Sequence, residues 1–170
     1  MSDPVTLKQI DEYRQHFDAM YVGGIPNLLN DDGAFLSFLA VLAGTEALAG
    51  LCAPAVATGE RFRSFVAAYY PQEYQPHVEH LWAFRNAIVH AFNPGPFGLT
   101  HHNSRVHLKA SQEVVMLNAE DFFADFLFAA RHYFDALTTN AALQANFLKR
   151  VTARDGGAPQ VWVVQNPSQS

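Results

Sequence analysis

Three polar side chains, Arg85, Asn86 and His90, interrupt an otherwise apolar stretch that runs from Leu81 to Phe92. The apolar spacing is typical of an amphipathic helix, in which residues four apart project from the same face. Asn86 and His90 are therefore expected on one face, with Arg85 one step round and long enough to curl back. A cation, an amide and an imidazole that titrates near neutral pH would then share about one and a half helical turns.

This combination of groups suits chemistry on a phosphodiester. An imidazole can take the proton from a ribose 2′-hydroxyl or give one to the leaving oxygen. A guanidinium can hold the anionic phosphate and the extra charge of its transition state. No metal ion is needed when the nucleophile is the substrate's own hydroxyl, so we expect neither metal nor other cofactor. A structural alternative stays open, in which Arg85 pairs with a carboxylate and His90 caps the last helical turn.

The segment Arg85-Asn86-Ala87-Ile88-Val89-His90 resembles the Arg-x4-His motif of the HEPN superfamily, whose usual second residue is polar and often Asn. The resemblance covers this motif and the helical layout, roughly residues 1–140. It implies an up-and-down helical bundle and a metal-independent endoribonuclease that acts as a homodimer, with motifs from both subunits lining one cleft. Many members are toxins or phage-defence effectors, so the resemblance also implies an antitoxin protein as a partner.

A second candidate residue, Glu46, lies on a stretch that is apolar nearly all round, from about Ala34 to Cys52. A charge inside a membrane span is costly, so we expect a buried central helix and no membrane partner. Its small residues would let a neighbour approach closely, including the same helix of a partner subunit (Ala40, Ala43, Gly44, Ala47 and Gly50). A buried carboxylate needs a partner, and we predict Arg85. The pair is either structural or orients a catalytic Arg85; the resemblance offers modest support, because many HEPN members carry an acidic or polar residue there.

The composition of the chain limits its domain count, its partners and its cellular compartment. The 170 residues are 49% hydrophobic and include 14 Phe and 6 Tyr, which suits one domain (residues 1–165) with a disordered tail (166–170). The aromatic load favours a second buried surface such as a dimer interface. The net charge is −5 with only 11 Lys and Arg, so any contact with RNA should be small and local. The single cysteine, Cys52, and the lack of a signal-peptide pattern predict a cytoplasmic protein.

The predicted fold class is mainly α: an up-and-down helical bundle with a small β-hairpin inserted before the last long helix. Helices are expected from Pro4 to about Gly23, over 34–52, over 60–70, from Pro76 to Asn93, over 119–138 and over 141–151, with Asn118 capping the fifth. Residues 105–109 and 113–117 read as the two strands of the hairpin, and residues 160–164 as a short additional strand.

Histidines outside the motif are candidate metal ligands or substrate contacts. His77 and His80 stand three apart, and His101, His102 and His107 follow, but no HExxH, paired Cys or clear carboxylate set accompanies them. Scattered surface histidines are therefore favoured over a metal site. The turn-rich segment 93–104 is either a plain connector or a loop that closes over the motif and brings His102 and Asn103 to substrate. The alternative function is a non-catalytic helical module that binds a nucleotide, small anion or partner protein.

Overall fold

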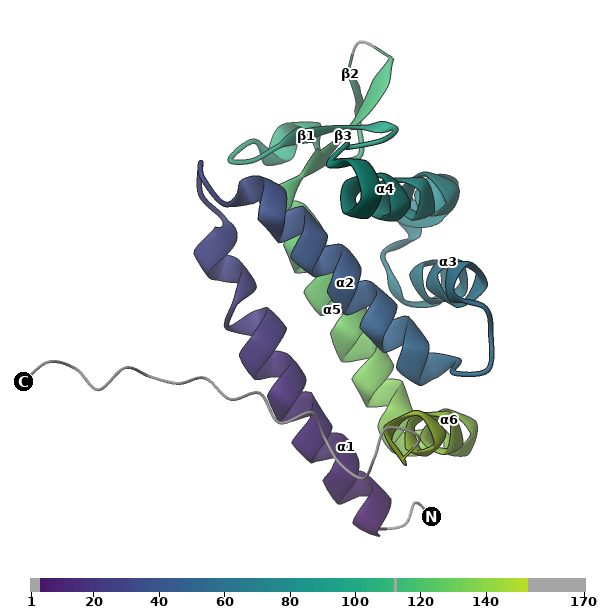
Figure 1. Cartoon of the computed structure of the whole chain (residues 1–170). Coiled ribbons are helices and arrows are strands. Elements are labelled where there is room, and N and C mark those ends of the chain that lie inside the picture. Colours follow the sequence, from purple (N-terminus) through teal and green to yellow (C-terminus); the bar gives the residue numbers. More distant parts are fainter. Residues whose placement is uncertain (1–3, 112, 153–170) are drawn as a thin grey trace, which may run out of the picture.

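Three long helices form the frame of the molecule, in a computed structural model that describes residues 4–111 and 113–152. They are α1 (Pro4–Phe17), α2 (Ala34–Cys52) and α5 (Ala119–Thr139). Figure 1 shows them side by side along one direction, whereas α3 (Thr58–Tyr69), α4 (Val78–Ala91) and α6 (Ala141–Thr152) are seen nearly end-on. The mainly α bundle with a small sheet before its last long helix, predicted from the sequence, is confirmed.

The starts of α5 and α6 follow from local capping chemistry. The Asn118 side-chain oxygen accepts a hydrogen bond from the Asp121 amide at 3.0 Å, so the predicted cap of α5 is confirmed. Asn140 ends α5 and caps α6 in the same way, accepting from Ala142 and Leu143 at 3.0 and 3.1 Å. Pro76 lies in a 3-10 helix, Gln72–His77, that leads directly into α4.

The core is largely aromatic and is built on α5. One face of this helix is buried, and its Phe122 stacks on Phe38 of α2 with ring centroids 6.1 Å apart. Gly44 of α2 allows the closest approach: a Cβ there would lie 2.5 Å from Cζ of Phe126 and 2.9 Å from Cε1 of Tyr21. This small residue of α2 is therefore covered by the chain's own α5 and Tyr21.

By length and composition, α2 is the one helix among the described residues that is apolar enough to cross a bilayer. Within the fold, 56% of its most apolar window is buried. Phe38, Val41, Leu42 and Leu48 are each at most 2% exposed, and α2 packs against α3, α5 and α6. It therefore serves as the central core helix that the sequence predicts.

A three-stranded sheet closes one end of the bundle, with strand order β1-β3-β2. Its strands are β1 (Phe97–Thr100), β2 (Ala110–Ser111) and β3 (Val114–Asn118); β2 pairs with β3 antiparallel as the predicted hairpin, and β1 pairs with β3 parallel. The prediction of a first hairpin strand over 105–109 was wrong. Residues Ser104–Val106 form a 3-10 helix, and Leu108 has a left-handed φ of 52°, so the chain turns within the predicted strand. Its last two residues, Leu108 and Lys109, both bond to Met116 of β3, just ahead of β2. The strand β1 within the expected loop was not predicted.

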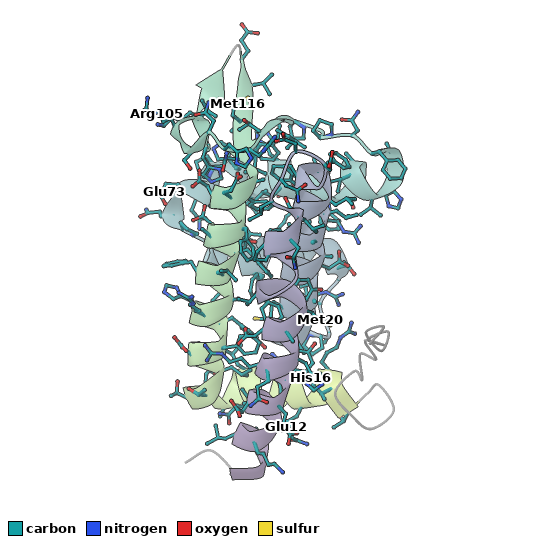
Figure 2. All side chains as sticks on the ribbon, turned by 90° about the vertical axis from the view of Figure 1, so that its left-hand side faces the viewer. Glu12, His16, Met20, Glu73, Arg105 and Met116 are labelled. Carbon is teal, nitrogen blue, oxygen red and sulfur yellow. The ribbon has the colours of Figure 1, made fainter. Side chains whose placement is uncertain are left out.

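Figure 2 views the molecule from the side of α1 and shows Glu12, His16 and Met20 in a row along this helix and its continuation. All three are exposed, including the His16 ring. Its Nδ1 lies 2.9 Å from the backbone oxygen of Glu12, one turn earlier. The predicted strand over 160–164 and the tail over 166–170 lie outside the described residues.

Candidate functional site

The motif helix α4 presents an apolar face to the core and a polar face outward. Leu81, Phe84 and Ile88 are each at most 1% exposed, as their helical spacing predicts. The helix ends at Ala91, where Phe92 adopts a left-handed φ of 49° and donates its amide to the Ala87 oxygen. This left-handed cap ends α4 two residues before the Asn93-Pro94 step that was expected to stop it.

Arg85 and Glu46 form the predicted ion pair. The Arg85 Nε donates to Glu46 Oε2 at 2.5 Å, joining α4 to α2, and the two side chains are 22% and 23% exposed. One Nη1 hydrogen is donated to the side-chain oxygen of Asn86 at 3.2 Å. Two of the five N–H donors of Arg85 are thus engaged, which leaves the far edge of the guanidinium for a ligand.

Trp82 fixes the plane of this guanidinium further. The Arg85 Cζ lies 5.6 Å from the centroid of the Trp82 ring, within cation–π range. The other cation at this ring is Arg63 of α3, with its Cζ 5.4 Å from the same centroid. Arg63 also donates through Nε to Glu79 at 2.8 Å. The carboxylate, the amide and the indole together hold Arg85 in one orientation before any substrate arrives.

His90 is exposed at the last turn of α4, one turn beyond Asn86 on the same face. Its imidazole is therefore reachable from solvent, and it is neither sealed in the core nor held in a buried ion pair. The neighbouring apolar side chains are also uncovered: Val89 is 43% exposed and Phe92 is 80% exposed. The free edge of Arg85 and this imidazole lie within about one and a half turns of one helix, and the apolar pair beside His90 is open to a second protein surface.

The remaining histidines separate into three groups in different parts of the fold. His77 and His80 stack with ring centroids 6.0 Å apart, and both contact the ring of buried Phe97 in β1. Burial, followed by the charge of His80, lowers the pKa of His77. This pair forms packing contacts with the sheet, so His77 and His80 do not share a site with the later histidines.

His107 belongs to a buried polar cluster that was missed from the sequence. The Tyr74 hydroxyl donates to Asp125 Oδ2 at 2.8 Å, and the His107 Nε2 lies 3.1 Å from both of those oxygens. The Asn118 amide donates to His107 Nδ1 at 3.1 Å, so the ring proton sits on Nε2. This cluster fastens the sheet to α5 and to the 3-10 helix before α4. In the sequence, the one indication of this cluster is Asp125, an acidic residue beside the apolar face of the fifth helix.

Tyr74→Phe tests the contribution of this cluster to stability. Burial raises the pKa of Tyr74 well above its ordinary value, so its hydroxyl stays protonated and donates to Asp125. Removing a hydrogen bond to a partly exposed carboxylate should lower the free energy of unfolding by about 1–2 kcal/mol. Urea unfolding of wild type and variant measures it. Tyr21→Phe, which removes a half-buried hydroxyl that makes no hydrogen bond to the described residues, should change stability less; equal losses would contradict the role assigned to the cluster.

His101 and His102, considered as substrate contacts, lie elsewhere. Both face Asp31 in the turn before α2, and His102 also contacts Glu120 at the start of α5. Asn103 precedes the 3-10 helix and is exposed. The structure thus brings Arg85, Asn86 and Glu46 into contact and places His90 on the same face, whereas the loop histidines gather around a different carboxylate.

Comparison of the chain with known proteins returned no match: no protein-family model, no curated protein and no solved structure is significantly similar to it.

Proposed function

We propose that this protein is a metal-independent endoribonuclease of the HEPN kind, with Arg85, Asn86 and His90 as its catalytic residues and Glu46 as the residue that positions Arg85. The observation that carries the proposal is the contrast between Arg85 and His90 on one helix. Arg85 is held by Glu46 and Asn86, with part of its guanidinium free, while the imidazole of His90 remains open to solvent. A preorganised cation beside an accessible acid–base group is what phosphodiester transfer needs.

The reaction uses the substrate's own ribose. The 2′-oxygen attacks phosphorus, forming a new P–O bond while the bond to the 5′-oxygen of the next nucleotide breaks. An imidazole takes the proton of the 2′-hydroxyl, and a second acid gives a proton to the departing 5′-oxygen. The guanidinium stabilises the charge that builds on the phosphoryl oxygens. The products are a 2′,3′-cyclic phosphate and a 5′-hydroxyl.

A second copy of the chain is part of the proposal. Glu46 offsets the charge of Arg85, so one motif by itself attracts phosphate weakly, and one imidazole cannot act as base and acid at the same moment. Two motifs related by a two-fold axis supply two guanidiniums and two imidazoles in one cleft. The exposed Val89 and Phe92 beside each His90 are the apolar surface such a homodimer would bury. As a toxin or phage-defence effector it would take an antitoxin protein as a further partner.

The test is cleavage of single-stranded RNA in the presence of excess EDTA. We expect a random-sequence RNA pool and total cellular RNA to be cut to fragments with 2′,3′-cyclic phosphate and 5′-hydroxyl ends, read by mass spectrometry. The same sequences made as DNA should stay intact, because they lack the attacking hydroxyl. Intact RNA in every condition, or 3′-hydroxyl and 5′-phosphate ends that form only with added Mg²⁺, would contradict the proposal.

One alternative follows from the same pair of residues. The free N–H donors of Arg85, held in place by Glu46 and Asn86, also suit a non-catalytic module that binds a nucleotide or another small anion. In that case a nucleotide raises the melting temperature of the protein while RNA is left uncut. The melting curve and the cleavage assay on one preparation distinguish the two functions.

A further inference from the structure

Two histidines and a carboxylate from separate segments converge at the sheet end of the bundle. Asp31 lies in the turn before α2, and His101 and His102 follow β1; Figure 1 shows both segments at the end of the molecule opposite α6. The Asp31 Oδ1 is 3.5 Å from His101 Nε2 and 3.8 Å from His102 Nε2. One ligand atom from each of the three residues lies within 4.8 Å of the others.

These separations do not describe hydrogen bonds. A nitrogen-to-oxygen hydrogen bond spans about 2.7–3.2 Å, so both contacts of Asp31 are too long. They do agree with two ligands of one ion: bonds of about 2.0–2.2 Å at tetrahedral angles separate the ligand atoms by about 3.4 Å. The separations of Asp31 from the two histidines are therefore within a few tenths of an ångström of the spacing in a coordination shell.

Glu120 contacts both the ring and the backbone of His102. Its Oε1 lies 2.9 Å from His102 Nδ1, and its Oε2 accepts the backbone amide of His102 at 3.1 Å. The ring contact is poorly aligned for a hydrogen bond, yet a nitrogen and a carboxylate oxygen this close require a proton on the nitrogen. In the neutral ring that a metal ion requires, Nδ1 then carries the proton, and the lone pair is on Nε2, which lies 3.8 Å from Asp31 Oδ1. A carboxylate behind a histidine is the usual support of a metal ligand.

Backbone geometry brings the two adjacent rings to the same side. Successive side chains of an extended chain point in opposite directions, but His102 has a left-handed φ of 58°. Its ring meets that of His101 with centroids 4.3 Å apart. Both Nε2 atoms consequently face Asp31 rather than opposite sides of the loop.

We infer that Asp31, His101 and His102 form a binding site for a divalent transition-metal ion, with Zn²⁺ as the expected occupant and Glu120 as the positioning residue of His102. Imidazole and carboxylate ligands in a three-ligand set with an open fourth position suit Zn²⁺. Two carboxylates beside two neutral rings balance the charge of a divalent cation. They also offset the nearby N-termini of α2 and α5, whose dipoles disfavour a cation.

The site is independent of the proposed nuclease activity. Its ligands contact neither Arg85 nor His90, and its bound ion would tie the segment after β1 to the starts of α2 and α5. The sequence by itself predicts scattered surface histidines here, and the site corrects that prediction for His101 and His102. Asp31 lies 70 residues before His101, and Glu120 lies 18 residues after His102. No local sequence motif therefore indicates the site.

The test is calorimetric titration of ZnCl₂ into full-length protein that carries no polyhistidine tag and has been freed of metal with a chelator. Wild type is expected to bind one equivalent, and His102→Asn or Asp31→Asn to weaken binding by more than about 100-fold. Glu120→Gln should weaken it by about 10- to 100-fold, the usual effect of losing the support of a ligand. Melting temperatures without metal show that each variant is folded.

The matched control is the double variant His77→Asn with His80→Asn, which removes the other histidine pair and should bind Zn²⁺ as wild type does. Zn²⁺ should raise the melting temperature of wild type and of this control, but not of His102→Asn. Cleavage of RNA in EDTA should be unchanged in His102→Asn, so failure of the metal site and failure of the nuclease are distinguishable. A wild-type protein that binds no Zn²⁺, or binding that survives all of Asp31→Asn, His101→Asn and His102→Asn, would overturn the inference.

Discussion

His90→Ala is expected to reduce the rate of RNA cleavage by at least about 100-fold, because a positioned acid–base group contributes about 10²–10⁴ to such a reaction. The substitution leaves Arg85, Asn86 and Glu46 in place, since His90 is exposed and makes no contact that holds them. The stability of the variant should stay within about 0.5 kcal/mol of wild type, as for other exposed positions. Single-turnover cleavage in EDTA and urea unfolding measure the two quantities.

The matched control is His132→Ala, which removes another exposed histidine, on α5, where its ring contacts Phe128 at 4.0 Å between centroids. It should cleave RNA at the wild-type rate. If both variants lose activity equally, the effect is not specific to the motif. If His90→Ala cleaves as fast as wild type, the imidazole has no part in the chemistry and the proposed mechanism fails.

Phe92→Glu is expected to convert a dimer into monomers and to abolish cleavage with it. Phe92 is 80% exposed beside His90, and a two-fold axis near the motif would bring the two copies of this residue together. Like charges opposed in an interface cost several kcal/mol, which weakens the dimer by about 100-fold or more. Sedimentation velocity over a range of concentrations measures the dissociation constant, and the cleavage assay follows on the same samples.

Phe128→Glu serves as the control, because Phe128 is 42% exposed on α5 and lies outside the motif helix. This variant should remain dimeric and active. The loss of activity in Phe92→Glu should also be relieved at high protein concentration, where the dimer re-forms. A Phe92→Glu protein that is as dimeric as wild type, or a wild type that is monomeric and still active, would contradict a shared cleft.

The features that could be predicted from the sequence are those with a local signal. The bounds of α2 and α5 follow from long apolar runs and from the Asn118 cap. The Glu46–Arg85 pair followed from one carboxylate on an apolar helix and one cation on the motif helix, since each needs the other when partly buried. A partly buried charge needs a counter-charge, and the apolar helices offer few. The pair could therefore be predicted although its two residues are 39 positions apart in the chain.

The features that were missed depend on pairing between distant segments. The strand β1 is only four residues long and is stabilised by parallel pairing with β3. No turn residue in the sequence indicates this pairing. The cluster of Tyr74, His107 and Asp125 likewise joins three elements, and none of the three residues is unusual by itself. The gathering of Asp31 with His101 and His102 has the same origin, because the fold brings the turn before α2 against the end of β1.

The most direct measurement is a crystal structure of the protein with the DNA version of an RNA that it cleaves, which binds but lacks the attacking hydroxyl. Our account predicts one phosphate in a cleft on a two-fold axis, with the free edge of Arg85 on its oxygens and a His90 imidazole within hydrogen-bond reach. A phosphate bound elsewhere on the protein, or two His90 side chains at opposite ends of the assembly, would contradict it.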